Sequence, residues 1–89
     1  MFKIVLAYSG VAASVGAATA ADITREFADH RPWHKGVECT WDGAQLILQA
    51  LNEVDEEGLE LMDEFSDCLA AYIAEPIEGD ISVVAITRL

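Results

Sequence analysis

The strongest constraint on the fold is a repeat of mostly apolar side chains at every fourth position between residues 11 and 30. Side chains with this spacing lie on one face of an α-helix, so we expect a helix over this whole range. Pro32 disfavours helical geometry at the preceding residue and ends the helix. A strip of small residues beside the repeat allows this helix to approach a sheet closely. The repeat is Val11, Val15, Thr19, Ile23 and Phe27, and the strip is Ala12, Gly16 and Ala20.

Three other segments have the patterns of β-strands. Residues 2–8 form a short apolar run that Ser9 and Gly10 interrupt, which is typical of a buried strand. Residues 37–41 alternate between apolar and polar side chains, as a half-buried strand does. Residues 80–87 are rich in β-branched side chains and form the clearest strand in the sequence.

The segment between the last two strands predicts two further helices. Asp42, with Gln45 three positions later, resembles a capping box at the start of one helix, and Asp55 can cap the next. Pro76 and Gly79 indicate where the second of these helices ends. The expected buried side chains of the first are Ala44, Ile47, Leu48, Leu51 and Val54. Those of the second are Gly58, Leu61, Met62, Phe65, Leu69, Tyr72 and Ile73.

These elements predict a single acidic α/β domain over residues 1–89, because a chain of this length supports one hydrophobic core. Their order is β-α-β-α-α-β. Since helical sequence joins each pair of strands, right-handed crossovers give a small three-stranded, largely parallel or mixed sheet with three helices. An antiparallel partner for the last strand is the alternative.

The net charge of −11 comes from 16 acidic and 5 basic residues, which are unevenly distributed. Between Lys35 and Arg88 the chain has no basic residue, and most of its acidic residues lie in this stretch. Such a field repels nucleic acids, anionic lipids and acidic substrates, and it attracts basic surfaces. We therefore expect no direct binding of nucleic acid or membrane, and the expected partner is a basic protein surface.

The densest acidic cluster falls on the third predicted helix. Like charges three or four residues apart cost about 0.2–0.5 kcal/mol per pair, and no basic residue is interleaved to relieve them. One interpretation is a row of carboxylates that imitates phosphates and occupies a groove lined by Lys and Arg on a partner. The other is a solvated face that keeps the protein soluble. The row is Glu56, Glu60, Asp63 and Asp67, with Glu57 and Glu64 beside it.

The loop over residues 31–35 supplies a second candidate for contact with a partner. Trp and Arg are strongly enriched among binding hot spots, so Trp33 is a candidate apolar anchor. In the alternative interpretation, Trp33 folds back and fills the core while its neighbours face water.

Together these features predict a small binding protein of inhibitor type that blocks a nucleic-acid-binding surface by charge mimicry. In size and acidity, though in no motif, it resembles phage-encoded inhibitors of host defence such as anti-CRISPR proteins. The resemblance implies action in the cytoplasm of a host. A secretory signal is less favoured, because Ser9 and Gly10 interrupt the apolar run and a single Lys precedes it. The first alternative is a small structural or regulatory subunit that docks through an apolar face, for example as a homodimer.

The second alternative is a small enzyme or nucleotide-binding domain. Residues 3–10, with the sequence Lys-Ile-Val-Leu-Ala-Tyr-Ser-Gly, are similar to the opening of ATP-pyrophosphatase families such as argininosuccinate synthase. The resemblance implies that phosphate binds at the turn between strand and helix. Those families continue with a second glycine and an aspartate, whereas this chain continues with Val11, Ala12, Ala13 and Ser14. This difference argues against a phosphate site at the turn.

We expect no enzyme activity, no catalytic residues, no metal site and no cofactor. His30, His34, Cys39 and Cys68 lack the spacing of a known zinc module, and Pro32 separates the two histidines. The surrounding carboxylates disfavour a reactive thiolate. Both cysteines are expected to be reduced.

Overall fold

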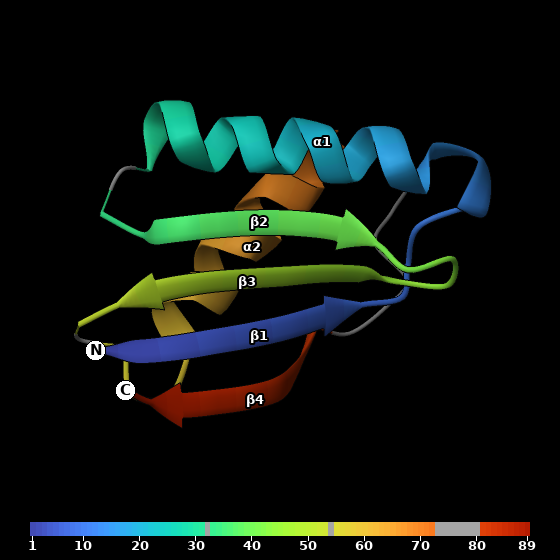
Figure 1. The fold of residues 1–89 in the computed structure, drawn as a ribbon. Coiled ribbons are helices and arrows are strands. Elements are labelled where there is room, and N and C mark those ends of the chain that lie inside the picture. The colour runs from blue at the N-terminus through green and yellow to red at the C-terminus, as the bar shows by residue number, and fades with distance from the viewer. Residues whose placement is uncertain (32, 54, 73–80) are drawn as a thin grey trace.

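The computed structural model describes residues 1–31, 33–53, 55–72 and 81–89. Four strands form one antiparallel sheet in the order β2-β3-β1-β4, with α2 behind it and α1 along β2 (Figure 1). The βαββαβ order with a split βαβ unit is the ferredoxin-like arrangement. The elements are β1 (Phe2–Tyr8), α1 (Ala13–His30), β2 (Lys35–Trp41), β3 (Leu46–Asn52), α2 (Leu59–Tyr72) and β4 (Ile81–Arg88).

The predicted three-stranded, largely parallel or mixed sheet with three helices is wrong. The structure has four antiparallel strands and two helices in its described residues, and the error lies in residues 42–54. These residues were assigned to a helix, but residues 42–53, which the structure describes, contain a tight turn and the strand β3. The last strand does run antiparallel to its neighbour β1, which was the alternative considered for it.

The capping-box pattern at Asp42 belongs to a β-hairpin. The Asp42 carboxylate accepts hydrogen bonds of 2.8 Å from the backbone N–H groups of Ala44 and Gln45, as a helix cap would. However, Gly43 has φ of 103°, and the Asp42 N–H donates to the Gln45 carbonyl oxygen at 3.1 Å. The chain therefore reverses here and continues as β3, which pairs with both β2 and β1.

The hydrophobic core lies between the sheet and the helices. Ile4 and Leu6 from β1, Leu48 from β3, Phe27 from α1 and Phe65 from α2 are all fully buried within it. The predicted bounds of β1 are confirmed, and the predicted helix over residues 11–30 is confirmed as α1 from residue 13 onward. Residues 80–87 were predicted as a strand, and β4 spans Ile81–Arg88.

The small-residue strip on α1 does allow a close approach, as predicted. A Cβ atom placed on Gly16 would lie 2.2 Å from Cδ2 of Trp41 on β2, so no larger residue fits without displacing the indole ring. Gly16 and Ala20 are buried, whereas Val15, predicted on the apolar face, is 48% exposed. The strip thus brings α1 against β2.

The two edges of the sheet have different surroundings. At the β2 edge, Thr24 of α1 accepts a hydrogen bond from the Cys39 N–H at 3.0 Å, and its hydroxyl oxygen lies 3.2 Å from the Cys39 carbonyl oxygen. At the opposite edge, β4 pairs with β1 alone among the described residues (Figure 1). Neither helix in the described part of the chain has the length and apolarity needed to cross a membrane.

Candidate functional site

The outward side of α2 and the turn before it carry exposed carboxylates. Glu60, Asp63 and Asp67 lie three and four residues apart on α2, so they share one face of the helix. Within the described ranges, the only carboxylates in ion pairs are those of Glu26 and Glu64. The outer carboxylates, as we call the exposed set, are Glu56, Glu57, Glu60, Asp63 and Asp67.

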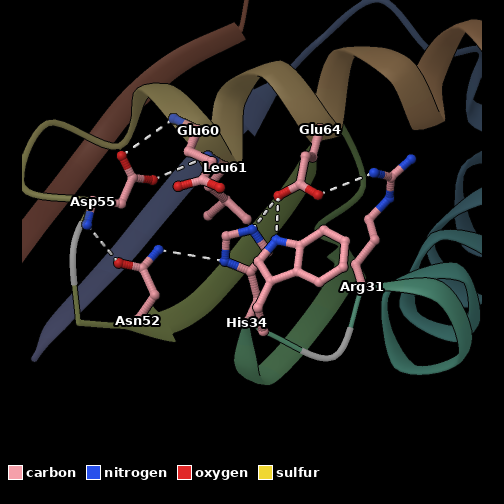
Figure 2. Close-up of polar contacts among 8 residues, drawn as sticks. Arg31, His34, Asn52, Asp55, Glu60, Leu61 and Glu64 are labelled. Atoms are coloured by element: carbon pink, nitrogen blue, oxygen red, sulfur yellow. Dashed lines mark hydrogen bonds and ion pairs between the residues drawn. The ribbon is translucent and has the colours of Figure 1, made fainter.

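Asp55 fixes the turn that positions two of these outer carboxylates. Its carboxylate accepts hydrogen bonds from the N–H groups of Glu60 at 3.2 Å and Leu61 at 3.0 Å, which caps the start of α2 (Figure 2). Gly58 closes the turn with φ of 73°, a value that disfavours other residues. Asp55 was predicted to cap a helix with Glu56 and Glu57 in its first turn; it does cap α2, but the helix begins only at Leu59, after the turn that holds these two residues.

Glu64 does not belong to the exposed set with which the sequence grouped it. Its carboxylate is buried against three donors from the segment between α1 and β2 (Figure 2). Arg31 Nη1 donates to Oε1 at 3.0 Å, Trp33 Nε1 donates to Oε2 at 3.1 Å, and His34 Nε2 also contacts Oε2. The negative charge of Glu64 is therefore compensated by donors within the protein.

The environment of Glu64 keeps its carboxylate ionised. Burial by itself would raise the pKa of Glu64, but the hydrogen bonds from His34, Trp33 and Arg31 outweigh burial and lower the pKa below its ordinary value. A carboxylate held in this way stabilises the fold.

Hydrogen bonds on the other side of His34 determine its tautomer. Asn52 Oδ1 accepts a hydrogen bond from the Asp55 N–H at 2.8 Å, so the Asn52 Nδ2 group faces His34 Nδ1 at 3.3 Å (Figure 2). Because Nδ2 is a donor, Nδ1 must accept, and the ring proton lies on Nε2 and points to Glu64. Both ring nitrogens of His34 thus have a hydrogen-bond partner within the protein.

Trp33 lies beside the acidic surface and does not fill the core. The residue is 53% exposed, while its indole N–H is anchored on Glu64. It borders a hollow of about 320 Å³, which Glu60 of α2 also lines. The structure therefore brings together Trp33 and Glu60, two residues that the sequence proposed separately. The hollow is lined by Met1, Trp33, His34, Lys35, Asn52, Glu53 and Glu60.

The two cysteines are buried and free. Burial raises the pKa of Cys39 to about 12, and it also raises the pKa of Cys68. Both thiols are therefore protonated at neutral pH and are poor nucleophiles. Within the described ranges, no group of three or more His, Cys, Asp and Glu side chains is placed to hold a metal ion.

Sequence reasoning missed the polar network around Glu64, although one signal for it was present. Glu64 follows Leu61 by three positions and precedes Cys68 by four, so it lies on the buried side of α2. An acidic residue on that side requires donors from another segment. Arg31, Trp33 and His34, clustered before β2, supply them.

Comparison of the chain with protein-family models, curated proteins and solved structures gave no match. Function is therefore inferred from the chemistry of the chain itself. Its most distinctive surface is the set of outer carboxylates with the neighbouring exposed ring of Trp33.

Proposed function

We propose that the protein binds a basic surface on a partner protein, of the kind that normally binds nucleic acid, and blocks it by charge mimicry. The observation that carries this proposal is that the outer carboxylates form no ion pair with any described residue. Crowded like charges of this kind are unfavourable in the free protein, and cations of a partner relieve them on binding.

The use of the chain's own cations supports this proposal over a simple solubility role. Arg31 is committed to Glu64, and the Arg88 guanidinium lies 5.6 Å from the centre of the Phe2 ring. Lys3 is exposed on β1, within the sheet, and Lys35 lines the same hollow as Glu60 but forms no ion pair with a described residue. Solubility requires net charge, but it does not require that one helix face lack every compensating base.

Trp33 extends the proposed contact surface with an apolar group. Its exposed ring borders the same hollow as Glu60, and its indole N–H is held by Glu64. A ring fixed before binding loses little conformational freedom in a complex, which favours its use as an anchor. The buried carboxylate of Glu64 thus supports the surface without itself meeting the partner.

The proposal is tested by capture of a partner at low salt and its release by a DNA oligonucleotide. A captured basic protein that DNA displaces supports mimicry, because both ligands then occupy one surface. The double variant Glu60→Lys/Asp63→Lys should weaken binding about ten-fold or more. The control Asp29→Lys/Glu38→Lys makes the same change in net charge at exposed positions on α1 and β2.

Two results would overturn the proposal. If both double variants bind the captured partner equally, net charge rather than the outer carboxylates drives association. If DNA fails to displace the partner, the protein does not occupy a nucleic-acid-binding surface.

A further inference from the structure

The hollow of about 320 Å³ described above has a buried polar floor and an exposed charged rim. His34 and Asn52, each 5% exposed, form the floor. The charged side chains around them are Glu53, Glu60 and Lys35, and all three are exposed. The volume is at the lower end of the roughly 300–1,000 Å³ that ligand pockets enclose, so the hollow can take one side chain or a group of similar size.

One chain of hydrogen bonds holds the two sides of the hollow in place. It begins at the aromatic side, where the indole N–H of Trp33 donates to Glu64, and it ends at the acidic side, at the backbone of Glu60. Because the two sides are fixed relative to each other before a ligand binds, little ordering is required on binding. The contacts run in order through Trp33, Glu64, His34, Asn52, Asp55 and the backbone N–H of Glu60 (Figure 2).

The lining of the hollow is suited to a guanidinium group. Glu53 and Glu60 form no ion pair with a described residue. The Trp33 side chain is 53% exposed, and tryptophan is the aromatic residue whose ring face attracts cations most strongly. A planar guanidinium both stacks on an aromatic ring and donates paired hydrogen bonds to a carboxylate, whereas an ammonium group is a strongly hydrated point charge. The combination of ring and carboxylates therefore favours arginine over lysine.

We infer that the hollow receives one arginine side chain of the basic partner, with the guanidinium stacked on Trp33 and hydrogen-bonded to the Glu60 carboxylate. Glu53 adds to the negative potential at the rim. The inference rests on the proposed function for the source of the arginine. It adds a preference for arginine that charge mimicry alone does not supply, because exposed carboxylates elsewhere on α2 attract lysine and arginine alike.

Lys35 opposes the binding of a cation and so provides a test of the opposite sign. It lines the hollow, but it forms no ion pair with a described residue, so it does not neutralise Glu53 or Glu60 by direct contact. Its charge repels an incoming guanidinium. Lys35→Gln should therefore lower the dissociation constant for an arginine side chain about two-fold or more.

The test is an NMR titration of the full chain with three blocked tripeptides, which are Gly-Arg-Gly, Gly-Lys-Gly and Gly-citrulline-Gly. The arginine peptide should bind saturably with a dissociation constant in the millimolar range and shift the indole N–H signal of Trp33. The lysine peptide should bind about five-fold more weakly, and the citrulline peptide, which keeps the shape without the charge, about ten-fold more weakly. The indole N–H of Trp41, which does not line the hollow, should not shift.

Matched variants assign the binding to the hollow. Trp33→Leu should abolish the preference for arginine over lysine, and Trp33→Phe, which keeps an aromatic ring, should retain part of it. Glu60→Gln should weaken binding of the arginine peptide about five-fold or more. Glu38→Gln makes the same change at an exposed position of β2 outside the hollow and should change the dissociation constant by less than about two-fold. Thermal unfolding followed by circular dichroism confirms that each variant is folded.

Three results would overturn the inference. They are an arginine peptide that gives no saturable shift at Trp33, equal affinities for the arginine and lysine peptides, and equal effects of Glu60→Gln and Glu38→Gln. The proposed function would survive each of them, because it requires displacement of a partner by DNA and no preference for arginine. Conversely, a partner that DNA does not displace would overturn the proposed function and leave binding of the arginine peptide in the hollow unchanged.

Discussion

The two sides of α2 carry the same kind of side chain in opposite environments. On the inner side, the Glu64 carboxylate meets donors from Arg31, Trp33 and His34. On the outer side, Glu60 and Asp63 are exposed and form no ion pair with a described residue. The chain therefore uses Arg31 to build the fold, and the outer carboxylates are left exposed, as the proposed contact with a basic partner requires. The difference teaches that acidic residues close together in the sequence are divided between a carboxylate satisfied inside the fold and carboxylates that face solvent.

Removal of the inner carboxylate should have the largest effect on stability. Glu64→Ala leaves Arg31 and the indole and imidazole N–H groups without their acceptor and should lower the free energy of unfolding by about 2–3 kcal/mol. Asp63→Ala, on the outer side, should change it by less than about 0.5 kcal/mol. Urea unfolding measures both. Equal losses in the two variants would remove the distinction between the two sides.

Low pH should selectively remove the stabilising contribution of Glu64, the carboxylate on the inner side. Although burial alone would raise it, hydrogen bonding holds the pKa of Glu64 below its ordinary value. Its stabilising contribution is therefore complete above the unfolded-state pKa of about 4.3 and is lost as pH falls through the lower folded-state pKa. The stability difference between wild type and Glu64→Gln should shrink below about pH 4 in urea titrations. A stability difference that grew as the pH fell would contradict the lowered pKa of Glu64.

Asp55 represents an intermediate case, in which backbone groups satisfy the carboxylate. It accepts hydrogen bonds from the N–H groups of Glu60 and Leu61 at the start of α2. Asp55→Ala should therefore lower the free energy of unfolding by about 1–2 kcal/mol. Asp55→Asn keeps one acceptor and should recover part of this loss. If both variants unfold at the same urea concentration as wild type, the cap does not stabilise α2.

Relief of repulsion on the outer side should give the smallest effect and the opposite sign. Asp63→Lys turns two repulsive pairs, with Glu60 and with Asp67, into attractive pairs. It should therefore raise the free energy of unfolding by about 0.2–0.5 kcal/mol per pair. The gain should shrink in high salt, where the charges are screened. Destabilisation at low salt would show that Asp63 has an internal partner.

Local patterns in the sequence predicted β1, α1 and β4 because each has one dominant signal. They failed at β3, because a central strand between β2 and β1 carries apolar side chains at consecutive positions such as Leu46, Ile47 and Leu48. Such a run fits helical and strand periods alike. The hydrogen bonds at Asp42 serve equally for a helix cap and for a hairpin turn.

Because β3 was not predicted, the arrangement of the predicted sheet was also wrong. Once β2 and β3 form a hairpin, the strands β2, β3 and β1 run antiparallel in turn. In the candidate site, the exposure of Glu60, Asp63 and Asp67 followed from helical spacing around Leu61 and Phe65, whereas Glu56 and Glu57, which were predicted on the same helix, lie in the turn before α2. The inward position of Glu64 was not predicted, because it depends on donors from a distant part of the chain.

The most direct test of the central claim is an NMR titration of the protein with an oligo-arginine peptide at low salt. Shift changes should concentrate at the outer carboxylates and the indole of Trp33, with little change at Asp29, Glu38 or the carboxylate of Glu64. Shift changes spread evenly over all exposed acidic residues would contradict the claim that one side of α2 is reserved for a basic partner.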